Sequence, residues 1–221
     1  MTTTPLRIEG AQTDLMRLHQ IVSPAFPIGS FAWSQGLETA ILRGDVAGPG
    51  AVADWCHSVL TAGSGRCDAI LLALARRSGA DLHTLATEAR ALATSARRLT
   101  ETLEQGAAFA GLARALGATD LPAAPLPVVV GAATRGLDVP TGIVTGYYLQ
   151  GVAAQIVSAA VRFLPMGQRD GQRILHDLTQ PLSALAMACA AAELTDLWTF
   201  TPGADLAIME HETQDVRIFR S

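Results

Sequence analysis

The segment from Val139 to Val161 contains no charged residue, and this feature limits the folds that are open to the chain. A stretch of this length can span a bilayer or form the inner helix of a bundle. The segment includes two polar glutamines, and Arg162 follows it directly, which favours a buried helix and no membrane association. Gly142 and Gly146 are four residues apart, so they share a helix face that a neighbouring helix can approach closely.

Apolar residues recur at helical spacing through most of the remaining sequence, and strand-like runs are almost absent. We therefore predict an all-α fold, a single-domain bundle of about eight to ten helices over residues 1–221 with the uncharged helix at its centre. Pro181 is expected to kink or split the last long helix. The predicted helices cover residues 13–22, 30–44, 51–61, 68–77, 81–116, 128–135, 141–163 and 172–197, and residues 23–29 form a loop.

Composition excludes several classes of function. All 16 basic residues are arginine, so the lysine that a P-loop or a Schiff-base enzyme needs is absent. A net charge of -4 with scattered arginines argues against nucleic-acid binding. Cys56, Cys67 and Cys189 are widely spaced in apolar surroundings, which indicates buried reduced thiols. With no apolar signal segment at the N-terminus, these features predict a cytoplasmic protein.

No pattern in the sequence commits the chain to catalysis. The nucleophile-elbow pattern Gly-x-Ser-x-Gly does not occur, and the histidines are isolated from one another. We therefore predict that the chain is not an enzyme and has no catalytic residue, metal site or cofactor. The remaining charged pairs are interpreted as solvated; they are Glu101 and Glu104, Glu210 and Glu212, Arg76 and Arg77, and Arg97 and Arg98.

Two segments are typical of contact with another protein. Pro24, Pro27 and Gly29 stiffen the loop at residues 23–29, which reduces the entropy lost on docking. Of the aromatic residues in and just after this loop, Phe31 is assigned to the core, whereas Phe26 and Trp33 fit the core or a partner contact equally well. The second segment is a polar docking tail from about residue 201, which carries Ile218 and Phe219 between two arginines.

Three segments together resemble the UreF family of urease accessory proteins. They are SPAFPIGSFAWSQGLE near the N-terminus, SAAVRFLPMGQRDGQRIL after the uncharged helix, and HETQDVRIFRS at the C-terminus. Their order and spacing match the family from about Leu15 to Ser221. Trp33 and Asp215 depart from the residues that the family often carries at those positions.

The resemblance implies an all-helical scaffold with no reaction of its own. Such a scaffold would act in nickel loading of urease, bind UreD (also called UreH) and the GTPase UreG, bring them to apo-urease, and form a homodimer. An alternative is a GTPase-activating protein that supplies a tail arginine, Arg217, to UreG. We expect the tail to become ordered when UreD binds and to offer Arg217 to UreG.

The resemblance also suggests which residues serve these roles. Partner binding is assigned to Phe26, Pro27, Gly29, Trp33, Glu38, His211, Glu212, Arg217, Phe219 and Arg220. A structural loop is assigned to Arg162, Gly167, Gln168, Gly171 and Gln172, with Arg162 capping carbonyls at the end of its helix. Glu38 is expected to pair with an arginine of the fold.

Overall fold

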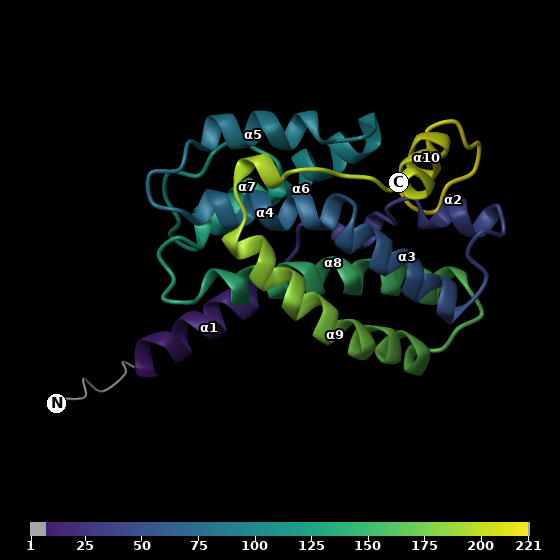
Figure 1. The fold of residues 1–221 in the computed structure, drawn as a ribbon, viewed down its shortest axis with the longest axis horizontal. Helices are drawn as coiled ribbons and strands as arrows, with labels where there is room; N and C mark the ends of the chain where they lie inside the picture. The colour runs from purple at the N-terminus through teal and green to yellow at the C-terminus, as the bar shows by residue number, and fades with distance from the viewer. Residues whose placement is uncertain (1–7, 221) are drawn as a thin grey trace.

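The computed structural model describes residues 8–220, and every regular element in that range is helical. Figure 1 shows long helices crossing one another around a central layer. The α-helices are α1 (Ile8–Val22), α2 (Leu37–Leu42), α3 (Pro49–Thr61), α4 (Ser64–Arg76), α5 (Leu82–Ala91), α6 (Ala96–Ala115), α7 (Leu126–Ala133), α8 (Thr141–Phe163), α9 (Gln168–Ala191) and α10 (Pro202–His211). Short 3-10 turns lie at Ser30–Ala32 (η1) and Leu194–Asp196 (η2). The predicted all-α class is confirmed, and Ser221, the last residue of the tail pattern, lies outside the described residues.

The most deeply buried helix is α4, which the sequence does not distinguish from the others. Every residue from Cys67 to Ala75 is buried, because α7, α8 and α9 all pack against this helix. A side-chain carbon on Gly131 of α7 would lie 2.5 Å from the carbonyl oxygen of Leu72, so only glycine allows this approach. The uncharged helix α8 packs against α1, α2, α3, α4 and α9, but it keeps one exposed face.

One continuous apolar stretch within residues 8–220, Pro49–Arg76, is long enough to cross a membrane. However, 72% of its most apolar window is buried inside the protein. A core helix gives the same signal, so this stretch is weak evidence for a membrane span.

Two predicted helices are interrupted in the structure. The helix predicted over residues 81–116 is two helices, because α5 ends at Ala91 and the side chain of Ser95 caps the start of α6. Pro181 does not split its helix, since α9 runs from Gln168 to Ala191 and packs against α8. The helix predicted over residues 30–44 is interrupted between η1 and α2.

The interruption before α2 has a local cause. Gln35 and Gly36 have φ angles of 52° and 77°, which lie in the left-handed region and end any right-handed helix. At Gly36, a side-chain carbon would lie 3.0 Å from the carbonyl oxygen of Ala204, so α10 packs directly onto this turn. The turn therefore positions α2 beside the start of the C-terminal tail, as Figure 1 shows for α2 and α10.

Candidate functional site

A buried carboxylate at the start of α2 holds the C-terminal tail. Glu38 is 2% exposed, and its Oε1 accepts a hydrogen bond from the backbone N–H of Ile218 at 2.8 Å. Its Oε2 accepts one from the N–H of Phe219 at 2.9 Å and lies 3.1 Å from Nε2 of His211. An ionised carboxylate only accepts, so it satisfies all three donors when Nε2 of His211 carries a hydrogen. The expectation that Glu38 pairs with an arginine is wrong, because backbone groups and His211 take that place.

Further contacts hold the tail on both sides of Glu38. Gln214 donates from Nε2 to Oγ1 of Thr39 at 2.9 Å, and the N–H of Arg220 donates to the carbonyl oxygen of Ala32 at 2.7 Å. The guanidinium of Arg220 lies 4.5 Å from the ring centroid of Trp33 and also pairs with Glu104. We call this set of contacts, centred on Glu38, the tail clamp.

The end of α8 closes over the tail clamp. Arg162 donates from Nη2 to the carbonyl oxygen of Phe31 at 2.9 Å and from Nε to that of Ser158 at 3.2 Å. Its guanidinium lies 4.6 Å from the ring centroid of Phe219, and the ring of Phe163 lies 5.9 Å from the same ring. Arg162 therefore binds a carbonyl oxygen within its own helix, and it also joins the N-terminal loop to the tail. All three segments that resemble the UreF family meet at this point.

The structure divides the assigned partner-binding residues into buried and exposed groups. Trp33, His211 and Phe219 are at most 5% exposed and form the inner part of the tail clamp. Phe26 is also buried, with its ring 5.3 Å from that of Phe109, so it belongs to the core. Phe31 is 71% exposed, and its assignment to the core is wrong.

The remaining assigned residues lie at or near the surface. Pro27 is exposed, and Gly29 has a φ of 77°, which glycine adopts without strain. Glu212 accepts from the backbone N–H of Arg97 at the start of α6. Arg217 is exposed, and its guanidinium donates to two carbonyl oxygens of its own tail, those of Gln214 at 2.8 Å and Glu212 at 3.2 Å.

The residues assigned to a structural loop form the junction of α8 and α9. Gly167 precedes α9, and its N–H donates to Asp170 at 3.2 Å. Gly171 is buried, and a side-chain carbon there would lie 3.1 Å from both Val157 and Val161 of α8. Gln168 and Gln172 are exposed in the first turns of α9.

Sequence reasoning missed the outer surface of the tail clamp. Val216 and Ile218 are 79% and 71% exposed, whereas Phe219 between Ile218 and Arg220 is buried. Phe31 lies close by, because its carbonyl oxygen accepts a hydrogen bond from Arg162, whose guanidinium lies over the ring of Phe219. The signal for this surface was the adjacent apolar pair Ile218 and Phe219, because neighbouring residues of an extended segment point to opposite sides and only one of them can face the bundle.

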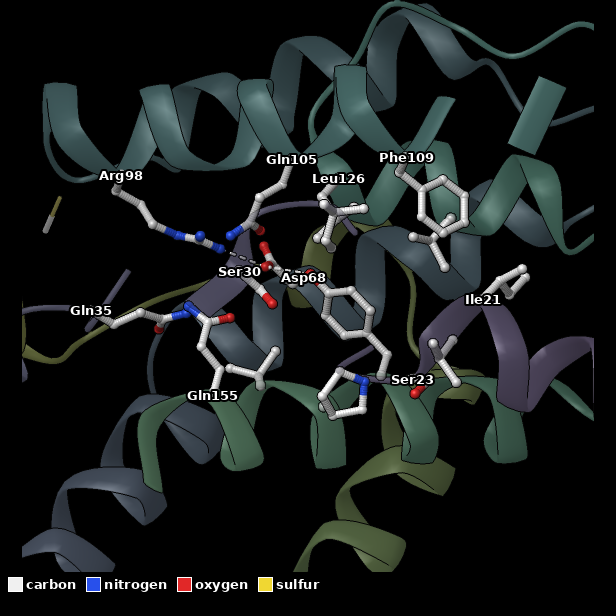
Figure 2. A pocket seen from close by; sticks show the side chains of 17 residues that line it. Ile21, Ser23, Ser30, Gln35, Asp68, Arg98, Gln105, Phe109, Leu126 and Gln155 are labelled. Atoms are coloured by element: carbon white, nitrogen blue, oxygen red, sulfur yellow. Dashed lines mark hydrogen bonds and ion pairs between the residues drawn. The ribbon is translucent and has the colours of Figure 1, made fainter. Parts of the chain in front are cut away.

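A buried ion cluster lies deeper in the bundle, beside the cavity of Figure 2. Asp68 accepts from Nη2 of Arg98 at 2.6 Å and from the hydroxyl of Tyr148 at 2.9 Å. Arg98 also pairs with Glu101, 3.1 Å from Nη1 to Oε2. The interpretation of Arg98 and Glu101 as solvated is wrong, because they are 7% and 1% exposed.

Two carboxylates share one guanidinium in this cluster. Burial raises the pKa of Asp68, although Arg98 and Tyr148 act in the opposite direction. Burial and the neighbouring Asp68 hold the pKa of Tyr148 well above its usual range. The adjacent cavity has a volume of about 60 Å³, enough for a few water molecules.

One amide connects the cluster to the tail clamp. Gln155 of α8 donates from Nε2 to Oε1 of Glu101 at 3.2 Å and to the carbonyl oxygen of Trp33 at 3.1 Å. Trp33 in turn stacks with Arg220 of the tail. A continuous path of polar contacts therefore runs from the tail to the centre of the bundle.

The structure offers little reactive chemistry in residues 8–220. That range contains no group of three or more His, Cys, Asp or Glu residues arranged to hold a metal ion. All three cysteines are free and buried, as predicted, and burial raises the pKa of Cys56 to about 12 and those of Cys67 and Cys189 to about 11. These thiols therefore stay protonated near neutral pH and are poor nucleophiles.

The fold and the tail clamp thus define an all-helical protein whose C-terminal segment is docked on its own bundle. The UreF family model matches residues 46–179. Urease accessory protein UreF of Paracoccus denitrificans is 50% identical over 206 residues, which cover 93% of this chain and 95% of that protein. The UreF proteins of Jannaschia sp. and Roseobacter denitrificans are 44% and 40% identical, and they cover 96% and 100% of this chain.

The chain belongs to the UreF family of urease accessory proteins. Its membership confirms the resemblance seen in the sequence and supports a role in urease maturation. Because the relatives are accessory proteins, the family also supports the prediction that the chain is not an enzyme.

Proposed function

We propose that this chain is a cytoplasmic scaffold for urease maturation that bridges UreD (UreH) and the GTPase UreG onto apo-urease during nickel loading. The scaffold acts as a homodimer and binds its partners without covalent chemistry.

The tail clamp carries this proposal. Glu38, His211 and Phe219 are buried, so they hold the tail in one conformation instead of binding a partner directly. The partner surface is the outer side of the tail clamp, where Phe31, Val216, Arg217 and Ile218 are exposed. Because the tail is docked on the bundle, it loses little conformational entropy when a partner binds it. Exposed apolar side chains next to an arginine are typical anchors of protein interfaces.

A truncated chain tests the proposal. A chain that ends at Gln214 keeps His211 against Glu38 but lacks Arg217, Ile218 and Phe219. We expect it to keep its helical circular dichroism and to lose UreG capture in a pull-down of the UreD complex. Leu42→Ala, at an exposed residue of α2, serves as a control that keeps UreG capture. If the truncated chain captured UreG and supported urease activation normally, the assignment of the partner surface would be wrong.

The alternative function is GTPase activation by Arg217. The exposure of Arg217 favours it, since an arginine that stabilises phosphoryl transfer must reach a partner's active site. Its guanidinium would first have to leave the carbonyl oxygens of Gln214 and Glu212.

Arg217→Ala separates the two functions. For a scaffold, we expect this variant to weaken complex formation and to leave UreG turnover unchanged once the complex is saturated. Loss of GTP turnover by at least about 10³-fold at saturation would instead identify Arg217 as an arginine finger. Arg169→Ala, at an exposed arginine of α9, controls for the loss of one positive charge.

A further inference from the structure

The buried ion cluster carries one more negative charge than positive charge. Asp68 and Glu101 share the single guanidinium of Arg98, and all three residues are at most 9% exposed. Among the described residues that line the cavity of Figure 2, only Asp68 and Arg98 are charged. A buried charge without a partner is costly, so the cluster would be more stable with one further positive charge beside it.

The free oxygen of Asp68 marks where that charge is missing. Its Oδ2 accepts hydrogen bonds from both Arg98 and the hydroxyl of Tyr148, at 2.6 and 2.9 Å. Its Oδ1 accepts none from the described residues 8–220. A carboxylate oxygen has two lone pairs, so Oδ1 is left able to bind a cation or a proton.

Two amide oxygens lie beside the same carboxylate. Gln105 and Gln155 both donate from Nε2 to Oε1 of Glu101, at 3.3 and 3.2 Å, which turns their own Oε1 atoms to other directions. Neither of these amide oxygens accepts a hydrogen bond from the described part of the chain, although Gln105 is only 3% exposed. Both residues line the cavity, and Figure 2 shows them directed, with Ser30, toward the carboxylate between them.

The size and the ligand atoms of the cavity select a class of ion. Its volume of about 60 Å³ holds a few particles of the size of a water molecule. Potassium is bound in proteins by carbonyl oxygens that replace its water shell. Ammonium, which is about as large as water, donates hydrogen bonds to the same kind of oxygen. The lining contains no imidazole or thiolate, the ligands that favour transition metals.

We propose that this cavity binds one small monovalent cation, potassium or ammonium, between Oδ1 of Asp68 and the amide oxygens of Gln105 and Gln155. The hydroxyl of Ser30 and water complete its shell. The single positive charge balances the ion cluster, whereas a divalent ion would leave an excess. Gln155 also donates to the carbonyl oxygen of Trp33, so the site lies on the path of polar contacts that leads to the tail clamp.

Thermal unfolding of the full chain near pH 7 tests the site. The starting salt is tetramethylammonium chloride, whose cation carries four methyl groups and donates no hydrogen bond, so the oxygen atoms cannot coordinate it closely. Its replacement by potassium or ammonium chloride at constant ionic strength should raise the Tm until the site is saturated. At about 100 times the dissociation constant, the folding equilibrium constant should rise about 100-fold and the Tm by about 5–10 °C. The salt that acts at the lower concentration identifies the ion.

Two variants locate the effect. Asp68→Asn removes the charge at nearly constant volume and should abolish the response to both salts. Gln105→Leu keeps both carboxylates of the cluster but lacks one amide oxygen, and it should weaken cation binding by at least about 10-fold even if the Asp68 variant does not fold. Glu104→Gln is the matched control, because Glu104 is a half-exposed carboxylate of the same helix and its loss should leave the response unchanged.

Equal Tm values of the wild type in the three salts would overturn the proposal and indicate that a proton on Asp68 supplies the balancing charge. An unchanged response in the Asp68 and Gln105 variants would also overturn it, because the cation would then bind elsewhere. The test measures unfolding of the isolated chain, so its result is independent of UreG capture and of the scaffold function.

Discussion

Glu38→Gln should release the C-terminal tail and lower the free energy of unfolding by about 3 kcal/mol. The two side chains have nearly the same volume, so packing around α2 is preserved. However, an amide NH₂ replaces one oxygen and faces a donor, either a backbone N–H of the tail or Nε2 of His211. At least one buried donor then loses its acceptor, and the carboxylate charge that strengthened the other hydrogen bonds is gone.

Denaturant unfolding and hydrogen exchange at Ile218 and Phe219 measure this effect. The exchange of both amides should become much faster, and the chain should lose UreG capture as the truncated chain does. Glu104→Gln is the control, because its pair with Arg220 is about half exposed and contributes less than about 1 kcal/mol. Unchanged exchange at both amides in the Glu38 variant would show that the tail is held by other contacts.

Arg98→Met should destabilise the fold by about 3–5 kcal/mol at neutral pH, because it leaves Asp68 and Glu101 buried without the guanidinium that pairs with both. Methionine fills most of the same volume, so the effect is mainly electrostatic. Without Arg98, the pKa of Asp68 in the folded protein rises further above its unfolded value, because the guanidinium that lowers it is gone. The folded state then binds more protons than the unfolded state, so stability decreases as the pH rises above the unfolded pKa near 4.

Denaturant unfolding at several pH values tests this prediction. Arg98→Met should lower the free energy of unfolding more at pH 7 than at pH 5. Adding Glu101→Gln to this variant should restore part of that free energy. Arg97→Met is the matched control, because the side chain of Arg97 is only half-buried and lies outside the ion cluster. If Arg98→Met lowered the free energy of unfolding equally at both pH values, Arg98 would stabilise the fold by packing and not by its charge.

The sequence predicted the helical class because burial of α4, α7 and α8 leaves a strong apolar pattern in the residues themselves. It did not predict the break before α2, since that break depends on Gln35 and Gly36 adopting left-handed angles under α10. It also misread Arg98, whose partner Asp68 lies 30 residues earlier, because a charged residue in a helix pattern looks solvated until its partner is known. Burial of a charge depends on tertiary contacts, and a single sequence does not show them.

The site was predicted in part for the same reason. The resemblance picked out three segments, and the structure brings them together at the tail clamp. Their residues, however, are separated by up to 181 positions, so the sequence could not show that Glu38 binds backbone groups of the tail. It also could not show which aromatic residues point inward. Phe31, which was assigned to the core, is exposed, and Phe26, for which the core and a partner contact were both open, is buried.

The tail clamp joins residue 38 to residue 219, a separation of 181 positions. Contacts this distant in sequence form only after the intervening helices have packed and brought the two segments together, because closing so long a loop costs entropy. The docked surface therefore depends on the folded state of the whole bundle. Partner recruitment through the tail would thus be restricted to correctly folded molecules, since a misfolded one does not present this surface.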